Sequence, residues 1–564
     1  MGVTPVGVTV LDRLARLMST APEPAPPARA PEPTFLATCR VGVNGDSPAV
    51  LARVLQALGA ASTEHRLLRR RLLPSAWVAH AVRNAAVGVP PLARCLDAGE
   101  LAAVIGFPLD GPQLPGLTLT GARELPPLPA IPRSGRVLGD ALGRAGRPVG
   151  VSVRESARGL LITAPTGGGK STLLENLCAA DFRAGRGVIV IESKGDLIAS
   201  LCDLVPRNRL GDVVVFDPSD ACPVGFNLLA GGEEAADLIT DHVVGQFRGL
   251  YASYLGPRSE MLLRASLLVL ARAREPYTIC EVIPLLTEPA FRRRILAGVG
   301  DHVLAGVWAW FEGQSEAARA EMTSPLVNKL AAFTLRPKLR AVVGQATSGL
   351  DFTSALAEGK IVLVSLSKGL IGTDAASLLG SCLVGALWNA IQARAGLPVS
   401  HRQFVSVVCD EAQDFLRLPV SLGDAVAQSR GMNVGWTVSH QNLGQLSPEL
   451  KRAVLANLRS KVVMQTTADD AHAFAREFSP HLTAADLQGL GAYEAYAAVS
   501  TGAAVAPPAS IRTRPTPPPE GHGGLVRARS QQRYGCDPAQ VEADLLVRLE
   551  SARNEAPVGA RRRS

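Results

Sequence analysis

In the segment LLITAPTGGGKST (residues 160–172) a short apolar run leads into a glycine-rich turn that ends in Lys-Ser-Thr. The apolar run is typical of a buried strand, and residues 173–180 continue in a pattern typical of a helix. A glycine-rich turn between a strand and a helix directs several backbone N–H groups at one point, where the helix N-terminus adds its positive dipole end. The segment therefore predicts a phosphate-binding loop, with a plain glycine turn as the alternative.

Each position of this loop has an expected role. The backbone of residues 166–169 would cradle phosphates, Lys170 would reach the β- and γ-phosphates, and Ser171 would ligate Mg²⁺. The residues expected to contact the nucleotide are Thr166, Gly167, Gly168, Gly169, Lys170, Ser171 and Thr172. The first position of the motif is Ala164, where glycine is usual, so the unusual backbone angles must come from the glycines at 167–169.

The same rhythm of short apolar strands and helices continues beyond the loop. Residues 188–192 and 213–217 are apolar runs typical of a parallel sheet that is covered on both faces. Strand-like runs return at 361–365, 405–409, 434–438 and 462–466. Between 233 and 345 only helical patterns occur, which predicts an all-α insertion into an α/β domain.

A second motif follows the strand-like run at 404–409, which ends in Asp410 and Glu411. An aspartate at the end of a buried strand can join the Mg²⁺ shell, and a neighbouring glutamate can act as the base or orient the attacking water. Alone, such a pair is weak evidence. Its position downstream of a phosphate loop favours a nucleotide-hydrolysing site with Walker A and Walker B motifs.

Residues from about 100 to 505 resemble the type IV coupling proteins of conjugative DNA transfer (TraD/TraG-type), which belong to the HerA/FtsK superfamily of RecA-like, usually hexameric motors. The resemblance is carried by the loop, by the acidic pair and by the segments IVIESKGDL (189–197), VVFDP (214–218) and GFNLL (225–229). Glu192-Ser193 stands where the family has Asp-Pro, so a role for Glu192 does not carry over.

The resemblance implies three further site residues. Arg430 stands where the family places an arginine finger that completes a neighbouring subunit's site, and Gln441 ends a strand where it would sense the γ-phosphate. Arg158 resembles a nucleotide-contacting arginine of the family. A surface arginine and a glutamine that only caps a strand are the alternatives for the first two.

We expect an α/β fold: a RecA-like P-loop NTPase with a parallel-dominated central sheet, an inserted all-α domain and a small N-terminal α/β domain. The expected parts are a disordered Pro/Ala-rich tail (1–34), the small α/β domain (35–107), a connecting arm (108–150), the two parts of the ATPase domain (151–232 and 346–505), the all-α insertion (233–345), and a Pro-rich, basic C-terminal tail with one helix (506–564).

Composition limits the classes of function. Apolar residues make up 47% of the 564 residues, which excludes a wholly disordered chain. The net charge of +8 lies at the ends: residues 1–150 carry 16 basic and 10 acidic side chains and residues 505–564 carry 10 and 6, against 32 and 34 between them. Net charge therefore does not predict a central body coated with nucleic acid.

The chain has nine scattered cysteines and no Cys-x-x-Cys pair, which argues against a disulfide framework and against a structural zinc site. This use of cysteine is typical of a protein in a reducing cytosol.

Two features bear on membranes. Residues 375–393 carry no charge over 19 positions, near the minimum for a membrane span, but contain polar residues and follow a strand-like run. A buried helix explains both facts better. The N-terminus shows no signal peptide and no anchor of the kind many coupling proteins have. We therefore expect either a soluble ring that docks on a membrane partner or a motor that moves DNA away from a membrane.

The motifs thus predict an enzyme that hydrolyses ATP with Mg²⁺. The resemblance to coupling proteins implies that it moves DNA, single-stranded DNA being favoured, as a homo-hexamer. It also implies a relaxase and a membrane secretion channel as partners, in the cytoplasm or at the inner face of the membrane. Two alternatives stay open: a double-stranded DNA pump or helicase of the same superfamily, and an ATP-gated scaffold for secretion-complex assembly that moves no DNA.

Overall fold

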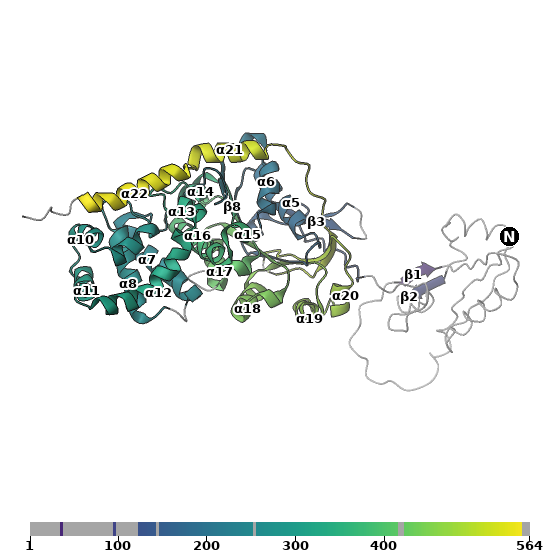
Figure 1. Cartoon of the computed structure of the whole chain (residues 1–564). Helices are drawn as coiled ribbons and strands as arrows, with labels where there is room; N and C mark the ends of the chain where they lie inside the picture. Colours follow the sequence, from purple (N-terminus) through teal and green to yellow (C-terminus); the bar gives the residue numbers. More distant parts are fainter. Residues whose placement is uncertain are drawn as a thin grey trace, which may run out of the picture. The chain divides into compact units, whose positions relative to one another are not determined.

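The computed structural model describes residues 34–37, 94–97, 122–142, 146–251, 255–415, 422–502 and 504–554 (Figure 1). The chain divides into two compact units, Met1–Leu119 and Thr120–Ser564. The described part of the first unit is an antiparallel pair of strands, β1 (Thr34–Ala37) and β2 (Arg94–Asp97). The rest of the expected tail (1–34) and of the expected small α/β domain (35–107) lies outside the described residues.

The second unit is built on one large mixed sheet. Its eleven described strands run in the order β4-β3-β13-β12-β11-β5-β10-β9-β6-β8-β7. From β11 to β7 neighbouring strands are parallel, whereas β4, β3, β13 and β12 are antiparallel to their neighbours. The strands are β3 (Arg136–Ala141), β4 (Pro148–Val151), β5 (Leu160–Thr163), β6 (Gly187–Glu192), β7 (Val213–Phe216), β8 (Ile361–Ser365), β9 (Val405–Asp410), β10 (Val434–His440), β11 (Ser460–Val463), β12 (Glu494–Ala498) and β13 (Ala509–Arg512). The predicted α/β fold with a parallel-dominated sheet, in which the phosphate loop joins β5 to the following helix, is confirmed.

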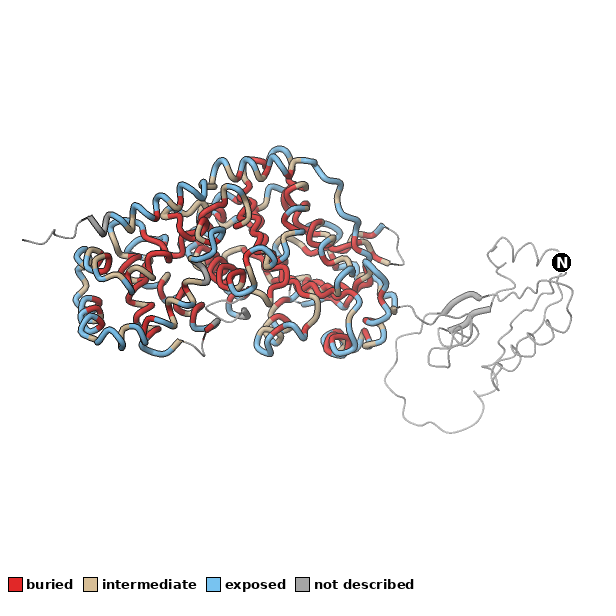
Figure 2. Tube along the Cα trace, viewed as in Figure 1, coloured by how far each residue is buried: buried red, intermediate tan, exposed pale blue. Residues whose placement is uncertain are grey.

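Helices cover both faces of this sheet, so the parallel strands β5, β6, β8, β9 and β10 are buried throughout (Figure 2). Alternate residues of β5 show the two layers, because Leu161 belongs to one hydrophobic cluster while Leu160 and Ile162 belong to the other. The helices of this domain are α4 (Val153–Ser156), α5 (Lys170–Arg183), α6 (Asp196–Asp203), α14 (Phe352–Glu358), α15 (Lys368–Ile371), α16 (Thr373–Ala393), α17 (Leu422–Gly431), α18 (Pro448–Asn457), α19 (Ala468–Glu477) and α20 (Ala484–Gln488).

The segment expected to be an all-α insertion lies at the end of the unit away from β3 (Figure 1). Its described residues form α7 (Gly232–Tyr251), α8 (Pro257–Ala271), α9 (Val282–Thr287), α10 (Pro289–Ala297), α11 (His302–Glu312), α12 (Glu316–Thr334) and α13 (Pro337–Val343), with one 3₁₀ turn at Ile279–Glu281. Pairs such as α7 with α8 and α8 with α12 pack against each other, and their apolar side chains join the cluster on one face of the sheet.

Helix α16 contains the uncharged stretch at 375–393. Among the described residues, Thr373–Gly396 is the one helix long and apolar enough to cross a membrane, and 78% of its most apolar window is buried inside the protein. The helix packs against α7, α14 and α17. Burial of this kind is what a core helix of a folded domain shows, which agrees with the buried-helix interpretation.

A buried ion pair fastens the antiparallel part of the sheet to α5, the helix that follows the phosphate loop. Arg136 on β3 is 1% exposed and donates from Nε to Asp181 on α5 over 3.1 Å. Its Nη1 and Nη2 donate to the hydroxyls of Thr437 on β10 and Ser406 on β9. One guanidinium thereby ties β3, α5, β9 and β10 together. Removal of one partner of such a buried pair costs about 3–5 kcal/mol.

The structure differs from two of the expected boundaries. Part of the expected connecting arm (108–150) forms β3 and β4, which are strands of the main sheet. The expected C-terminal tail (506–564) is also wrong as a description of its first 49 residues, because they supply β13, α21 (Gly523–Tyr534) and α22 (Pro538–Asn554). Proline-rich sequence on either side hides the four-residue strand β13 from any pattern of alternation.

The C-terminal elements are integral to the fold. Strand β13 lies between β12 and β3, α21 packs on α6 and β7, and α22 packs on α10 and α13 (Figure 1). Arg548 on α22 donates from Nε to Glu281 over 2.6 Å, and Arg340 on α13 donates to Glu542 over 2.8 Å. The C-terminal segment therefore connects the ATPase domain to the helical insertion.

Deletion of residues 506–564 is expected to prevent formation of a stable protein. Ile511, Val526, Val541 and Leu545 are buried, and each contributes about 1.5–3 kcal/mol. Their sum is comparable to the net stability of a typical protein. Soluble yield and thermal unfolding measure the effect, and a chain that ends at Asn554 is the matched control. A deletion variant that unfolds at the wild-type temperature would contradict this account of the C-terminus.

Candidate active site

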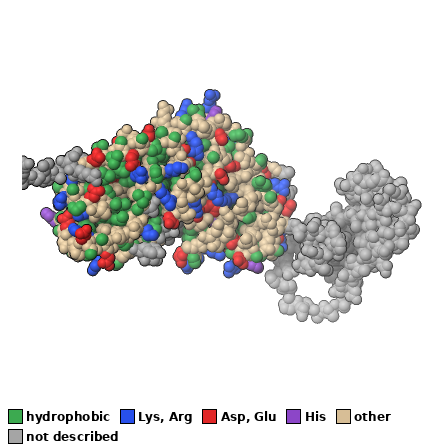
Figure 3. Space-filling model, in the orientation of Figure 1, with side chains coloured by type: hydrophobic (Ala, Val, Ile, Leu, Met, Phe, Trp, Pro, Cys, Tyr) green, Lys and Arg blue, Asp and Glu red, His purple; other side chains and the backbone are tan. Residues whose placement is uncertain are grey.

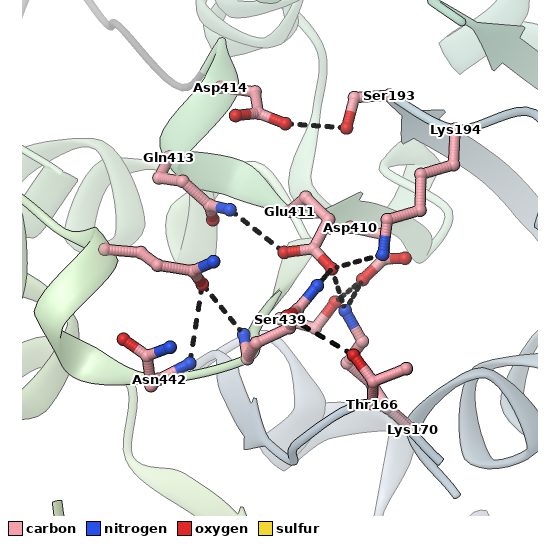
Figure 4. Close-up of polar contacts among 12 residues, drawn as sticks. Thr166, Lys170, Ser193, Lys194, Asp410, Glu411, Gln413, Asp414, Ser439 and Asn442 are labelled. Carbon is pink, nitrogen blue, oxygen red and sulfur yellow. Dashed lines mark hydrogen bonds and ion pairs between the residues drawn. The ribbon is translucent and has the colours of Figure 1, made fainter. Parts of the chain in front are cut away.

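The candidate site forms where four neighbouring parallel strands end. Strands β5, β10, β9 and β6 lie side by side, and their carboxyl ends meet at one edge of the sheet. The phosphate loop follows β5, Gln441 follows β10, Glu411 follows β9, and Lys194 lies two residues beyond β6. Segments up to 275 residues apart in sequence are brought together this way (Figure 4).

The phosphate loop has the backbone that its glycines permit. Gly167 and Gly169 have φ angles of 81° and 103°, in the left-handed region that favours glycine. Ala164 has no such angle, and its N–H donates to the carbonyl oxygen of His440 on β10. The alanine is therefore tolerated because it still continues the strand, and the turn begins after it.

Lys170 is the first residue of α5, and it is held by both carboxylates of the second motif. Its Nζ lies 2.7 Å from Oδ1 of Asp410 and 2.8 Å from Oε1 of Glu411. All three side chains are buried, with 8%, 4% and 2% of their area exposed. The lysine and the acidic pair, 240 residues apart, thus form a single ionic cluster at the mouth of the loop (Figure 4).

Glu411 is held in an unusual conformation and by several donors. Its φ of 52° lies in the left-handed region, where a non-glycine residue is strained, and such strain is concentrated at functional sites. Besides Lys170, Oε1 accepts from Lys194 at 3.0 Å and from Nε2 of Gln441 at 2.7 Å, and Oε2 accepts from Gln413. Burial alone would raise the pKa of Glu411, but the Lys170 ammonium and these hydrogen bonds outweigh it and lower the pKa to about 2. The carboxylate is therefore ionised at neutral pH.

Asp410 and Ser171 are the residues that could hold Mg²⁺. Asp410 is the last residue of β9, and its Oδ1 also accepts from the hydroxyl of Ser439 on β10 at 2.6 Å. Ser171 is exposed on the first turn of α5. The described residues contain no group of three or more His, Cys, Asp or Glu side chains placed to hold a metal. One carboxylate and one hydroxyl nevertheless fit Mg²⁺, which commonly takes one or two protein ligands together with phosphate oxygens and water.

Gln441 connects the acidic pair to the phosphate loop. Its amide nitrogen donates to Glu411, and its amide oxygen accepts a long hydrogen bond of 3.4 Å from the Thr166 hydroxyl. The side chain therefore spans the space above the loop from β10. It thus links Glu411 and the loop to the end of β10.

Two of the expected site residues lie elsewhere. Arg158 precedes β5, at the amino end of the strand and so at the opposite edge of the sheet from the loop, where it pairs with Glu155 over 2.8 Å. Within this chain Arg158 therefore lies away from the loop residues that are expected to bind the nucleotide. Arg430 is exposed on the last turn of α17, just before the amino end of β10, and so also lies at the opposite edge. A role for Arg430 would have to be played in a neighbouring subunit.

The structure adds residues that the motifs did not single out. Lys194 pairs with Glu411, Ser439 holds Asp410, and Tyr493 lines the same cavity as the loop. Burial would lower the pKa of Lys194, but its hydrogen bond to Glu411 and the nearby carboxylates raise it. The signal for Lys194 was its place at the end of a parallel strand. For Tyr493, which precedes an antiparallel strand, the sequence gives no comparable signal.

These groups surround a cavity of about 190 Å³. Its lining includes the loop residues Thr166, Gly167, Gly169, Lys170, Ser171 and Thr172, together with Lys194, Glu411, Gln441 and Tyr493. Backbone N–H groups at a helix N-terminus and two lysines attract an anion, and an ionised carboxylate beside them can accept a proton. The cavity thus combines anion binding with a base, which is what hydrolysis of a phosphate ester or anhydride requires.

No protein-family model matches the sequence, and no curated protein matches it. Solved structures do: a bacterial conjugative coupling protein, TrwBdeltaN70 in an unbound form, is 16% identical with a TM-score of 0.48, over 69% of this chain and 91% of that one. The chain is similar to the conjugative coupling proteins. The plasmid coupling protein TrwB in complex with ADP and Mg²⁺ matches equally (16% identity, TM-score 0.48, 69% and 92% covered). VirB4 of Thermoanaerobacter pseudethanolicus is 18% identical with a TM-score of 0.43, over 69% of this chain and 98% of that one.

The low pKa of Glu411 predicts a pH dependence of stability. A carboxylate whose pKa falls from 4.5 to about 2 on folding stabilises the protein above pH 4.5 and loses that contribution as the pH falls toward 2. By pH 4 the loss is about 1 kcal/mol. Lys170→Met removes the main cation, so the free energy of unfolding should fall less between pH 6.5 and pH 4 than in the wild type. Urea unfolding at both pH values measures this, and an identical loss in both proteins would contradict the ion pair.

Proposed function

We propose that this protein is an Mg²⁺-dependent ATPase that drives DNA through or along a ring of its own subunits, as a coupling-protein-like motor of conjugative transfer or type IV secretion. The observation that carries the ATPase is the convergence of the Asp410 and Glu411 carboxylates on Nζ of Lys170, at the end of the phosphate loop, at 2.7 and 2.8 Å. The similarity to conjugative coupling proteins, found in the motifs and again among solved structures, supports the motor.

The chain's own residues divide the work of hydrolysis. The loop N–H groups and Lys170 bind and orient the phosphates, with Thr172 beside them on the first turn of α5. Ser171 and Asp410 would hold Mg²⁺, which when bound would supply positive charge that offsets the charge of the phosphates. Glu411, kept ionised and strained beside the loop, orients the attacking water and accepts its proton. Gln441 carries the state of the γ-phosphate to β10.

DNA is the proposed load, with single-stranded DNA favoured, and a homo-hexamer is the proposed assembly. The near balance of charge between residues 150 and 505 means that DNA would be gripped locally. On the face shown in Figure 3, basic and acidic side chains lie among one another. A relaxase and a membrane secretion channel are the proposed partners, and the cytoplasm or the inner face of the membrane the proposed location.

Arg430 is proposed to complete the site of the neighbouring subunit. Its exposure, at the edge of the sheet opposite the loop, is compatible with action across an interface. An arginine in that role contributes roughly 10³–10⁵ in rate. Arg430→Ala and Lys170→Ala subunits, each inactive alone, should regain phosphate release when mixed, because some interfaces then pair an intact Lys170 with an intact Arg430. Absence of recovery in rings shown to be mixed would contradict the role.

The motor is tested by displacement of streptavidin from biotinylated DNA in the presence of ATP. We expect displacement from single-stranded DNA, and none with the Lys170→Ala variant. Displacement from duplex DNA alone would indicate the double-stranded pump or helicase. ATP hydrolysis without displacement from either substrate, and without stimulation by DNA, would contradict the motor and favour the assembly scaffold.

A further inference from the structure

A second cavity, of about 460 Å³, adjoins the phosphate-loop cavity. It is lined by Thr172, Ala492, Tyr493, Arg512, Thr513, Pro515 and Thr516. Thr172 and Tyr493 line both cavities, so the two spaces meet at the first turn of α5. The volume lies within the range of small-molecule sites, about 300–1,000 Å³.

Tyr493 is fixed against the phosphate loop. Its N–H donates to the carbonyl oxygen of Gly168 over 3.3 Å, and its carbonyl oxygen accepts from the N–H of Thr513 over 2.8 Å. A Cβ atom at Gly169 would lie 2.7 Å from Cδ1 of the ring, so the ring lies directly against the glycine backbone. Tyr493 has a φ of 64° yet keeps 47% of its area exposed. A strained backbone thus holds a partly exposed aromatic ring at the point where the two cavities join.

The opposite wall is also held in place, by α5 itself. Asn176 donates from Nδ2 to the carbonyl oxygens of Arg514 and Pro515, at 3.0 and 3.1 Å. The Thr516 hydroxyl donates to Glu175 over 2.7 Å. These bonds hold the segment 513–516 against the side of α5. The cavity between this segment and Tyr493 is therefore preformed.

We propose that this second cavity binds the nucleoside part of the nucleotide whose phosphates occupy the loop, with the purine base stacked on the ring of Tyr493. The inference rests on the proposed function and names the subsite that would hold the rest of the same molecule. A nucleotide anchored by its phosphates at residues 167–171 must place its sugar and base in a space continuous with the loop. The cavity that shares Thr172 and Tyr493 with the loop is such a space.

Stacking, rather than hydrogen bonding to the base, is the recognition that the lining offers. The hydroxyls of Thr513 and Thr516 already donate, to the carbonyl oxygen of Tyr493 and to Glu175. Arg512 is 63% exposed and pairs with Glu494. The Tyr493 ring is the aromatic group of the lining and is 47% exposed, and a base stacked on an aromatic side chain is a recurrent source of binding energy.

The test compares ligands with and without a base on variants of one residue. Calorimetric titrations would measure binding of ADP and of inorganic tripolyphosphate, both with Mg²⁺, to the wild type, Tyr493→Leu and Tyr493→Phe. We expect Tyr493→Leu to weaken ADP about tenfold, Tyr493→Phe to bind ADP within about twofold of the wild type, and tripolyphosphate affinity to be unchanged in all three. In the wild type, photoactivated 2-azido-ATP should label the peptide that contains residues 492–516, a readout that does not depend on a variant.

Several results would overturn the inference. Unchanged ADP binding by Tyr493→Leu would do so, and so would an equal loss of ADP and tripolyphosphate, which would mean that Tyr493 only shapes the loop. Labelling by 2-azido-ATP outside 492–516 would place the base elsewhere. If the wild type bound tripolyphosphate as tightly as ADP, the base would add no affinity, and the proposed base-binding subsite would be wrong while the ATPase proposal stood. If the wild type bound neither ligand, both the proposed function and the subsite would be wrong.

Discussion

Glu411→Gln should bind ATP at least as tightly as the wild type and release phosphate about 10²–10⁴-fold more slowly, the range lost with a positioned general base. The amide fills the same space, and its oxygen can still accept from Lys170, Lys194 or Gln441. It cannot accept a proton from water. Removal of a negative charge beside the loop also removes repulsion of the phosphates, so binding should not weaken.

Single-turnover phosphate release together with equilibrium binding of ATP separates the two effects. Glu449→Gln is the matched control, because Glu449 is an exposed carboxylate on α18. It should behave as the wild type in both measurements. Phosphate release by Glu411→Gln at the wild-type rate would show that another group orients the water.

Lys170→Ala is expected to reduce phosphate release by about 10²–10³-fold or more and to weaken ATP binding, because a methyl group cannot offset phosphate charge in the loop. The structure adds a second consequence. Asp410 and Glu411 are buried, and both direct a carboxylate oxygen at Lys170. Removal of the shared cation leaves two buried carboxylates with less compensation, so the protein without nucleotide should also lose stability, by about 3–5 kcal/mol.

Thermal unfolding without nucleotide and phosphate release with saturating ATP measure these two effects on the same preparation. Lys338→Ala is the matched control, since Lys338 is exposed on α13. It should change neither. A Lys170→Ala protein as stable as the wild type would contradict the ionic cluster, and one that hydrolyses ATP normally would contradict the site.

Most of the candidate site could be predicted because it is made of residues that follow parallel strands. The sequence around Lys170, Glu411 and Gln441 identified an apolar strand before each motif. Parallel strands of one sheet end at a common edge, so the three motifs meet without any knowledge of the loops between them. The same rule places Arg158 and Arg430 at the far edge, since each precedes its strand. A family motif names a residue's role but not the subunit in which that role is played.

The C-terminal part could not be predicted for a different reason. Strand β13 is four residues long and has prolines on both sides, and it is antiparallel to β12 and β3, so it carries no motif at its end. Helix α21 is identified as part of the fold by buried positions such as Val526 and Ser530, which contact elements more than 300 residues earlier in the chain. The local sequence pattern does not indicate contacts with such distant elements. Tyr493 was missed for the same cause, because its position beside Gly169 depends on the pairing of β12 and β13.

Whether this chain is an ATP-driven motor can be decided by steady-state phosphate release from ATP. Residues 1–564 would be assayed with Mg²⁺, with and without closed single-stranded DNA circles, alongside Lys170→Ala. We predict Mg²⁺-dependent release that DNA stimulates and that the variant lacks. Release no higher than that of Lys170→Ala, with and without DNA, would contradict the assignment of Lys170, Asp410 and Glu411 as the catalytic centre of an ATP-driven motor.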